Sequence, residues 1–452
     1  MSRASARALL TVVGALANAL AEAGAGAWTT DGPGSVTSAG VIADARVPGT
    51  IYVGTSGGVA RSTDGGRTWS PTTLLTGEPL AAAGGVVYAS VITAVGPPLI
   101  GGFDNVIYKS PDGGVHWQAL VDVGHVNSAI WIDPVTPTTL YRSDTTGVAP
   151  PVHLPDFAGL FRSTDGGTTW ARIDQGLVAN PITALAVDPH SHDTLYLANA
   201  RPFDVSRLYK SADAGSTWTL LSTGIGASSL VPDPNAMGTV YVAAGGIAVS
   251  TDGGLTFRSL AAPPGVFTLV IDPTSSSRLY AAANPTGIFG SSDAGANWGP
   301  MNQGLPGPSP PVEGLAIDAA GDALYTIVNG TVWHLEIEPA SLVLDAAHPF
   351  TITLTATDQR TGRNGAGVAH EVNDLWGYFS IPAITGNPNN PEVFVKMLDG
   401  TELNGSYWFF YGGLTDLEYT LTVTEDATGR QKTYTKPAGS ECGGSDTAAF
   451  TP

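Results

Sequence analysis

The stretch RSTDGGRTW at residues 61–69 decides the fold, because close copies of it recur along the chain. Each copy has a serine two residues before an aspartate, a glycine two residues after that aspartate, and an aromatic residue three residues after the glycine. Six copies cannot all form one active site, so the pattern indicates a repeated structural element. The other five copies are KSPDGGVHW (109–117), RSTDGGTTW (162–170), KSADAGSTW (210–218), VSTDGGLTF (249–257) and GSSDAGANW (290–298).

The chemistry of this stretch is that of a tight turn. An aspartate carboxylate accepts hydrogen bonds from the backbone amides of its own turn, as in Asx turns. The glycine supplies a positive φ that a side chain would oppose, and the large aromatic residue can pack between sheets as a wedge. We therefore expect a structural role, rather than catalysis or calcium binding, for Asp64, Asp112, Asp165, Asp213, Asp252 and Asp293.

The spacing of the copies predicts the architecture. Successive aspartates lie 48, 53, 48, 39 and 41 residues apart, a period typical of propeller blades. A second phrase, as in WIDPVTPTTLY and VIDPTSSSRLY, precedes most copies and indicates a strand, an Asp-Pro turn and another strand. Each unit is thus expected to hold four strands, with the copied turn between the third and the fourth. A basic residue recurs just before the turn, which predicts an exposed strand position for Arg61, Lys109, Arg162 and Lys210.

The ends of the repeat region raise the number of blades from six to seven. The segment VEGLAIDAAGDALYTIVNGTVWHLEI at residues 312–337 supplies three strands but no copy of the turn. The segment AWTT at residues 27–30 resembles an isolated fourth strand, and Trp28 precedes Trp69 by 41 residues. Pairing of these segments would close a ring and remove its free sheet edges. We predict an all-β protein with a seven-bladed propeller over residues 28–338.

The turn residues resemble the Asp-box, or BNR, repeat S-x-D-x-G-x-T-W. This repeat occurs in sialidases, in the propeller of sortilin-type receptors, in xyloglucan-cleaving hydrolases and in a photosystem II assembly factor. The resemblance implies a β-propeller, but it implies little about function, because in those families the box lies on the rim, away from ligands. The Phe-Arg-Ile-Pro motif of sialidases is absent, so the resemblance to that family ends at the repeat.

A second domain is predicted over residues 339–452. The repeats end near Pro339, and short alternating segments follow, beginning with FTITLTATD at residues 350–358. This pattern predicts a β-sandwich. The segment looks like a β-rich C-terminal module of exported bacterial proteins. Its aromatic run YWFFY at residues 407–411 would place rings on both faces of a strand, so core packing and a binding platform both stay open.

The N-terminus indicates export. Arg3 and Arg7 precede an uncharged, mostly apolar run from Ala8 to Leu20, and small residues follow. This order predicts a secretory signal peptide over residues 1–27 and a secreted or cell-envelope bacterial protein. The run is too short to span a bilayer, so we expect no transmembrane segment after cleavage. Cys442 is the only cysteine, which excludes an intramolecular disulfide.

Charge and motifs exclude several functional classes. The chain has 20 Lys and Arg residues against 39 Asp and Glu residues, a net charge of -19, which argues against nucleic-acid binding. Zinc-ligand spacings, a Walker loop and the common hydrolase motifs are absent, so we expect no cofactor and no metal. The segment HSHD at residues 190–193 has a metal-like composition, but it occupies the variable part of an Asp-Pro turn.

Any site is expected on the face opposite the copied turns, where the loops between the second and third strands lie. Three neighbouring loops there, in blades 2 to 4, are long, and long loops on a rigid ring often carry function. Glycoside hydrolysis needs two nearby carboxylates, for which the candidates are Asp104, Asp156 and Asp204. The ligand-binding candidates are Asp144, His153, Arg142, Arg201 and Arg207. Asp104 and Asp204 could equally be turn residues, and Pro150, Pro151 and Pro155 could simply stiffen a surface excursion.

Two hypotheses about function follow. The first is an exported, non-catalytic binding or scaffolding protein that recognises a glycan or a protein partner through its propeller. The alternative is a glycoside hydrolase of the Asp-box propeller type, with its carboxylates on the loops of blades 2 to 4. Turnover of a polysaccharide by the purified protein would discriminate between them.

Overall fold

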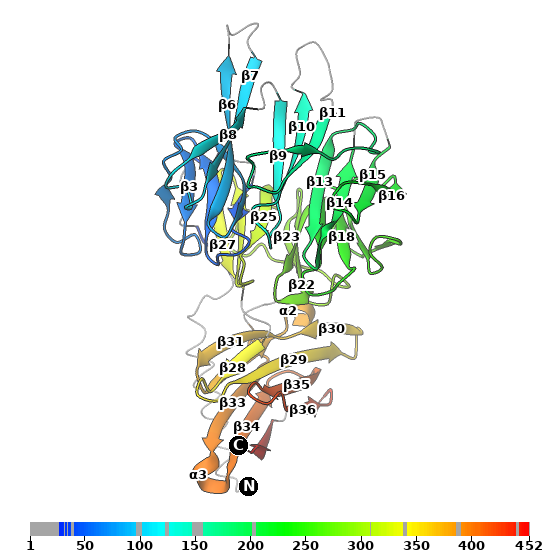
Figure 1. Cartoon of the computed structure of the whole chain (residues 1–452). Coiled ribbons are helices and arrows are strands. Elements are labelled where there is room, and N and C mark those ends of the chain that lie inside the picture. The colour runs from blue at the N-terminus through cyan, green and yellow to red at the C-terminus, as the bar shows by residue number, and fades with distance from the viewer. Residues whose placement is uncertain are drawn as a thin grey trace.

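The computed structural model describes residues 27–30, 32–33, 35–37, 40–95, 102–122, 126–146, 157–200, 205–307, 309–337, 341–385, 390–439 and 443–451. These residues form strands, turns and two short helices, so the all-β prediction is confirmed (Figure 1). No helix within these ranges is long and apolar enough to cross a membrane. Most of the expected signal peptide, at residues 1–26, and Cys442 lie outside the described residues.

The described residues up to 337 form seven antiparallel sheets, six of four strands and one of three. The first three sheets consist of β1 (Ile42–Ala43), β2 (Ile51–Thr55), β3 (Gly58–Ser62) and β4 (Ser70–Pro71); β5 (Glu78–Ala83), β6 (Val86–Val95), β7 (Gly102–Ser110) and β8 (Gln118–Asp122); and β9 (Val126–Ile132), β10 (Leu140–Thr146), β11 (Phe157–Ser163) and β12 (Ala171–Arg172). The next two consist of β13 (Ile182–Asp188), β14 (Ser191–Asn199), β15 (Arg207–Ser211) and β16 (Thr219–Thr223); and β17 (Ser229–Pro232), β18 (Val240–Ala243), β19 (Ile247–Ser250) and β20 (Arg258–Ser259). The last two consist of β21 (Val266–Asp272), β22 (Ser275–Ala283), β23 (Gly287–Ser291) and β24 (Gly299–Pro300); and β25 (Val312–Ile317), β26 (Ala323–Val328) and β27 (Thr331–Glu336).

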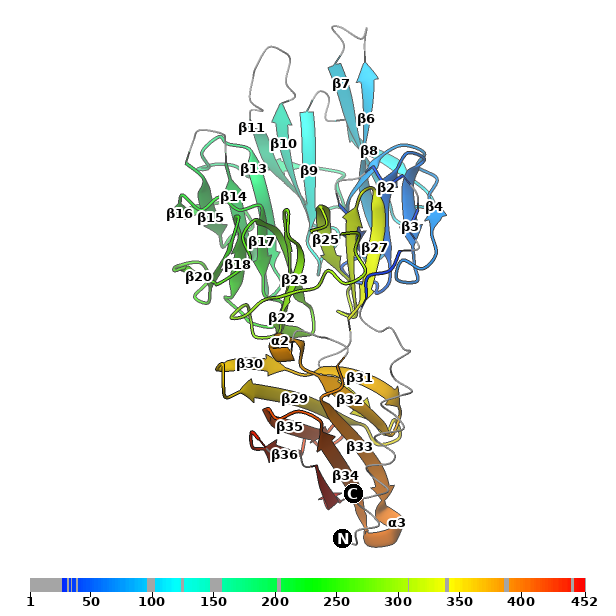
Figure 2. The same ribbon diagram turned by 180° about the vertical axis from the view of Figure 1, so that it is seen from behind.

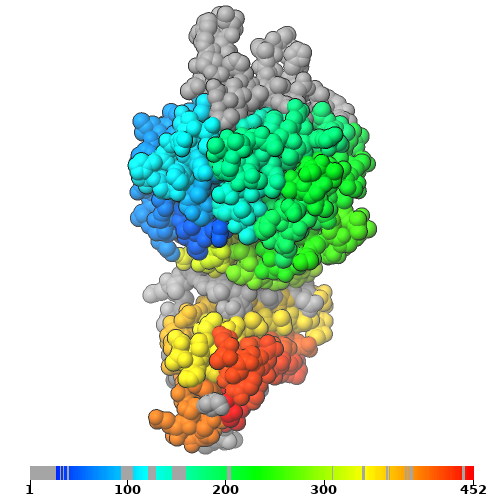
Figure 3. Space-filling model, viewed as in Figure 1, coloured from blue at the N-terminus to red at the C-terminus, as the bar shows by residue number. Residues whose placement is uncertain are grey.

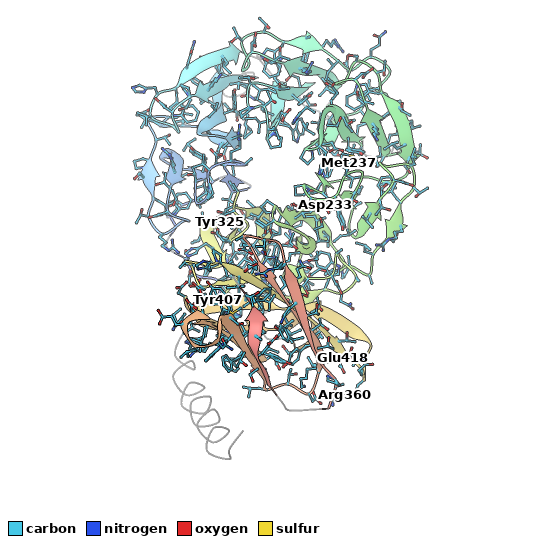
Figure 4. All side chains as sticks on the ribbon, turned by 60° about the horizontal axis from the view of Figure 1, so that its bottom comes forward. Asp233, Met237, Tyr325, Arg360, Tyr407 and Glu418 are labelled. Carbon is cyan, nitrogen blue, oxygen red and sulfur yellow. The ribbon has the colours of Figure 1, made fainter. Side chains whose placement is uncertain are left out.

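The sheets are arranged in a ring around a common axis, as a propeller requires (Figure 4). The first strand of a sheet lies against the first strand of the next, as β1 does against β5 and β5 against β9. The seventh sheet returns to the first, because β25 contacts β1. The N-terminal segment lies beside β27, where Thr29 and His334 form an antiparallel bridge.

One apolar cluster fills each junction between neighbouring sheets. Every cluster contains a tyrosine from the second strand of one sheet and a large aromatic residue from the edge of the sheet that follows or, at the sixth junction, from the N-terminal segment. The tyrosines are Tyr52, Tyr88, Tyr141, Tyr196, Tyr241, Tyr280 and Tyr325, and all are buried. Their partners are, in the same order, Trp117, Trp170, Trp218, Phe257, Trp298, Trp28 and Trp69. The aromatic residues therefore act as wedges between sheets.

The remaining residues form two five-stranded sheets that share one hydrophobic core (Figure 2). The first sheet contains β28 (Ser341–Leu344), β29 (Phe350–Asp358), β30 (Arg363–Ala366), β35 (Glu418–Glu425) and β36 (Gln431–Lys436). The second contains β31 (Val368–Asn373), β32 (Trp376–Ser380), β33 (Val393–Gly400), β34 (Ser406–Gly413) and β37 (Gly444–Phe450). Two single-turn helices, α2 (Pro382–Thr385) and α3 (Thr401–Asn404), lie in the connections. Figure 3 shows this part as a narrower body below the ring.

The aromatic run of β34 divides between the two faces of its strand. Tyr407 and Phe409 are buried in the shared core. Trp408 and Phe410 lie on the other face and are half-buried, and the indole Nε1 of Trp408 donates a hydrogen bond of 2.9 Å to Asn404 Oδ1. Tyr411 also packs against this core, so core packing explains three of the five rings, while Trp408 and Phe410 are partly open to solvent.

Candidate functional site

The six copied turns have one hydrogen-bond pattern, shown here for the first. Ser62 Oγ donates to Asp64 Oδ1 at 2.8 Å and accepts the backbone amide of Gly66 at 2.9 Å. The backbone amide of Thr68 donates to Asp64 Oδ1 at 2.8 Å, and the Thr68 hydroxyl donates to the other carboxylate oxygen at 2.5 Å. Gly66 has a φ of 87°, which explains the invariant glycine at this position. Both carboxylate oxygens of Asp64 therefore accept hydrogen bonds within its own turn.

These hydrogen bonds stabilise the ionised carboxylates. Donation from Thr68, Thr169 and Thr256 holds the pKa of Asp64, Asp165 and Asp252 at about 2. The pKa of Asp112 and Asp213 is lowered in the same way, through His116 and Thr217. A carboxylate with a depressed pKa is a poor proton donor near neutral pH, so these five aspartates are poor candidates for a general acid.

The turns between the first and second strands bind neighbouring sheets to each other. Asp44 is buried, and its carboxylate accepts the backbone amides of Gly84 and Gly85 in the second sheet at 2.7 and 2.8 Å. Asp318 of the seventh sheet accepts the amide of Gly49 in the first sheet at 3.1 Å. From the sequence these aspartates indicated a turn only; the structure adds a hydrogen bond between sheets.

These turns and the Asp-box turns share one face of the ring. Within a sheet, the backbone amide of Gly65 donates to the carbonyl of Gly49 at 3.0 Å, and Gly166 donates to Thr138 at 2.8 Å. The turns between the second and third strands are therefore at the opposite ends of the strands. Figure 1 shows β6, β7, β10 and β11 extending on that face, away from the two C-terminal five-stranded sheets.

The basic residue that precedes the first four boxes is not at an exposed position, which corrects the expectation from the sequence. Arg61, Lys109, Arg162 and Lys210 are all half-buried. Lys109 Nζ donates to the carbonyl of Gly166 in the next sheet at 3.1 Å, and Lys210 Nζ donates to Gly253 at 2.9 Å. The residue faces the box of the following sheet, which a single unit of sequence cannot reveal.

Arg142 and Asp144, two of the ligand-binding candidates, lie on β10. Arg142 Nε is 3.0 Å from Asp144 Oδ1, and each side chain is 8% exposed. The guanidinium lies 4.8 Å from the ring centroid of Phe161 and 4.7 Å from that of Trp170. This pair therefore packs within the ring, where it contacts the box tryptophan of the third sheet, and it offers little surface to a ligand.

The other candidates are described in part or not at all. Asp104 pairs with Thr93 between β7 and β6, but its side chain lies outside the described residues. Arg207, at the start of β15, is half-buried and donates a hydrogen bond of 2.8 Å to the carbonyl of Val205. His153, Asp156, Arg201 and Asp204 lie outside the described residues. The structure thus brings together only Arg142 and Asp144.

The axis of the ring contains an apolar cavity of about 250 Å³. Its lining comes from the first strands of the first four sheets and the residues next to them, and includes Ile42, Leu80 and Trp131. The described residues that line the cavity include no titratable side chain. It can hold an apolar group, but it offers no acid, base or nucleophile for catalysis.

A second cavity, of about 270 Å³, lies between the first and second sheets on the face opposite the boxes. Its one charged lining residue is Glu78 at the start of β5. Burial raises the pKa of this carboxyl above its usual 4.5, while a hydrogen bond of 3.2 Å from the Thr37 hydroxyl opposes the rise. The sequence analysis missed Glu78; the only signal was that this unit lacks the Asp-Pro phrase.

The histidines of HSHD also form contacts between and within sheets. His192 Nδ1 lies 3.0 Å from Asp133 Oδ2 of the third sheet, and His190 Nδ1 lies 3.4 Å from Asp188 Oδ1. Among the residues that the structure describes, no group of three or more His, Cys, Asp and Glu side chains could hold a metal ion.

Comparison with known proteins supports the repeat. The family model described as BNR/Asp-box repeat matches residues 60–71. No curated protein matches the chain. A structure of YCF48 from Cyanidioschyzon merolae is similar with 13% identity and a TM-score of 0.47, over 69% of this chain and 99% of that one. A GH74 enzyme from Niastella koreensis is similar with 15% identity and a TM-score of 0.36, over 89% of this chain and 75% of that one.

The surface protein PorZ from Porphyromonas gingivalis is similar with 12% identity and a TM-score of 0.39, over 86% of this chain and 64% of that one. Likenesses this distant transfer no function to the chain. The identification comes from the repeat itself, whose serine, aspartate and glycine make the same hydrogen bonds in all six turns, as at Ser291, Asp293 and Gly295. The chain therefore contains a β-propeller that carries BNR/Asp-box repeats.

Proposed function

We propose that this protein is an exported, non-catalytic binding or scaffolding module that recognises a glycan or a protein partner through its propeller. The partner would contact the face opposite the Asp-box turns. The ends of β6, β7, β10 and β11 lie on that face (Figure 1). The cavity beside Glu78 also opens there, since the turn residues Thr55 and Ser56 line it.

One observation carries the proposal. The carboxylates that recur in the repeat are committed to the architecture, either to turn hydrogen bonds that lower their pKa, as at Asp165, or to amides of the neighbouring sheet, as at Asp44. A ring whose repeated acids are used in this way is a rigid frame, and recognition falls to its non-repeated loops and cavities. The similar structure of YCF48 bound to D1 peptide is an example of such a protein with a peptide ligand.

The proposal is tested by retention of a partner. The full chain, immobilised through its C-terminus, would be incubated with a glycan array and with envelope and secreted material from bacteria. We expect specific retention that survives washing and is competed by the free chain. Failure to retain any glycan or protein, together with turnover of a polysaccharide, would refute the proposal.

A glycoside hydrolase is the alternative proposal. It requires carboxylates on the loops of blades 2 to 4, for which Asp104, Asp156 and Asp204 are the candidates. Asn variants at these three positions would be compared with the parent on a panel of polysaccharides and sialosides. Turnover that one substitution abolishes would establish the enzyme and overturn the non-catalytic function.

We also propose the finer organisation of the chain. Residues 1–27 would be a signal peptide for export, residues 28–338 a seven-bladed propeller, and residues 339–452 a β-sandwich domain. The bridge between Thr29 and His334 supports closure by the N-terminal strand. The common core of the two C-terminal sheets supports a sandwich.

A further inference from the structure

The cavity beside Glu78 is polar, whereas the cavity at the axis of the ring is lined by apolar residues. Among the lining residues that the structure describes, all except Gly77, Ile92 and Glu78 carry a hydroxyl group, and none is basic or aromatic. The hydroxyl-bearing residues are Thr37, Thr55, Ser56, Thr76 and Ser90. The cavity therefore offers one carboxylate and several oxygen acceptors in one place.

The carboxylate is held in the cavity by the local fold. Thr37 donates to Glu78 Oε1 at 3.2 Å, which orients one oxygen. On the other side the carboxylate rests against Gly54 of β2, because a β-carbon at this position would overlap Glu78 Oε2. The absence of a side chain at Gly54 thus makes room for the acid between the first and second sheets.

The lining selects the chemical class of the ligand. A carboxylate among hydroxyl oxygens matches a primary ammonium group, which has three donors and one positive charge. A quaternary ammonium would instead call for an aromatic cage, and a sugar ring would gain from an aromatic platform, but none of the lining residues that the structure describes is aromatic. Ile92, which is 52% exposed, offers an apolar contact beside the cavity for an alkyl stem.

From this lining we propose that the Glu78 cavity binds the side-chain ammonium of a lysine presented by a protein partner. This inference rests on the proposed binding function and names the contact by which the propeller would recognise a protein. The excess of acidic over basic residues, a net charge of -19, would favour the approach of a basic partner. Burial of Glu78 also fits, because an added cation would stabilise the carboxylate that burial now destabilises.

The test measures binding of defined probes to the full chain by calorimetric or NMR titration. The probe is a blocked tripeptide with a central lysine; the comparison probes carry Nε-acetyl-lysine or trimethyl-lysine, and spermidine and glucosamine represent other amines. We expect the lysine peptide to bind best, and acetylation and trimethylation each to weaken binding. Stronger binding of spermidine or glucosamine than of the lysine peptide would overturn the assignment to a protein lysine.

Two variants connect binding to the cavity. Glu78→Gln keeps the shape and removes the charge, and should weaken the lysine peptide by about tenfold or more, since the lost interaction is a charge-assisted hydrogen bond. Gly54→Ala keeps the charge but displaces the carboxylate, and should also weaken binding. The matched control is Glu313→Gln, because Glu313 is an exposed acid on β25, the first strand of another sheet, outside the cavity.

The outcomes separate this inference from the proposed function. Equal affinity of the Glu78→Gln and Glu313→Gln variants, both folded by circular dichroism, would refute the lysine site. If the Glu78→Gln variant still retained a partner in the pull-down experiment, the binding function would stand without this site. Turnover of a polysaccharide would remove the non-catalytic function while leaving the affinity ratio for the lysine peptide as measured.

Discussion

Removal of the Trp28 side chain should destabilise the whole ring rather than one end of the chain. Trp28 is 2% exposed and packs between the sixth and seventh sheets, in a cluster with Tyr280 and Leu335. Its indole Nε1 donates to the carbonyl of Met301 at 2.6 Å, and its backbone amide donates to Gln303 at 2.9 Å. We expect Trp28→Ala to cost about 3 to 5 kcal/mol, since it removes a fully buried aromatic ring and leaves a cavity.

The assay is equilibrium unfolding of the full chain in urea, followed by far-ultraviolet circular dichroism. A second variant, Gly304→Ala, disturbs the contact between Trp28 and Gly304 from the other side. Gly304 has a φ of 92°, and a β-carbon there would overlap the backbone of Trp28. The control is Leu75→Ala, because Leu75 is 73% exposed and its loss should change the stability by less than about 0.5 kcal/mol. If Trp28→Ala and Gly304→Ala both unfold like the control, the N-terminal segment does not close the ring.

Three further predictions use the same unfolding assay. The pKa of Asp165 is about 2, below its ordinary 3.8, so its ionised form contributes stability above pH 3.8 that is lost as the pH falls toward 2. The Asp165→Asn variant should therefore lose less stability than the parent over this pH range. Identical pH profiles of the two proteins would contradict this prediction. Lys109→Met should cost about 1 kcal/mol, since it removes the hydrogen bond to Gly166 in the next sheet; an unchanged urea midpoint would show that this contact contributes nothing. Arg142→Met should cost about 3 to 5 kcal/mol, because it leaves Asp144 buried without this cation, and the double variant Arg142→Met with Asp144→Leu should cost less; the reverse order would refute the reasoning.

Local chemistry explains why so much of the fold was predictable from the sequence. The hydrogen bonds that the serine and aspartate side chains make within an Asp-box turn join residues at most four positions apart, as between Asp64 and Thr68, so this part of the turn is encoded within a few residues. The alternation of apolar residues in FTITLTATD likewise predicted a strand, and β29 spans Phe350–Asp358. The strand β32 ends at Ser380 and the short helix α2 begins at Pro382, because this proline lacks the amide that would continue the strand.

The candidate site was predictable only in part, because its residues act across junctions between sheets. The long loops were visible in the sequence, but the burial of Arg142 depends on the ring of Trp170, 28 positions away. The cavity acid Glu78 was not visible, since its partner Thr37 lies 41 residues away. The residues next to Arg142 and Glu78 in the sequence do not indicate either of these contacts.

The amino-acid sequence by itself determined the repeated turns, the four-strand unit and the all-β class, because these depend on interactions between residues close in the chain. Only the tertiary structure decided which side chains face each other between sheets: Lys109 toward Gly166, Asp44 toward Gly84, and Glu78 toward Gly54. The physical reason is that a repeat defines the position of a residue within its own sheet. The neighbour that this residue meets is set by the packing of the next sheet around the ring.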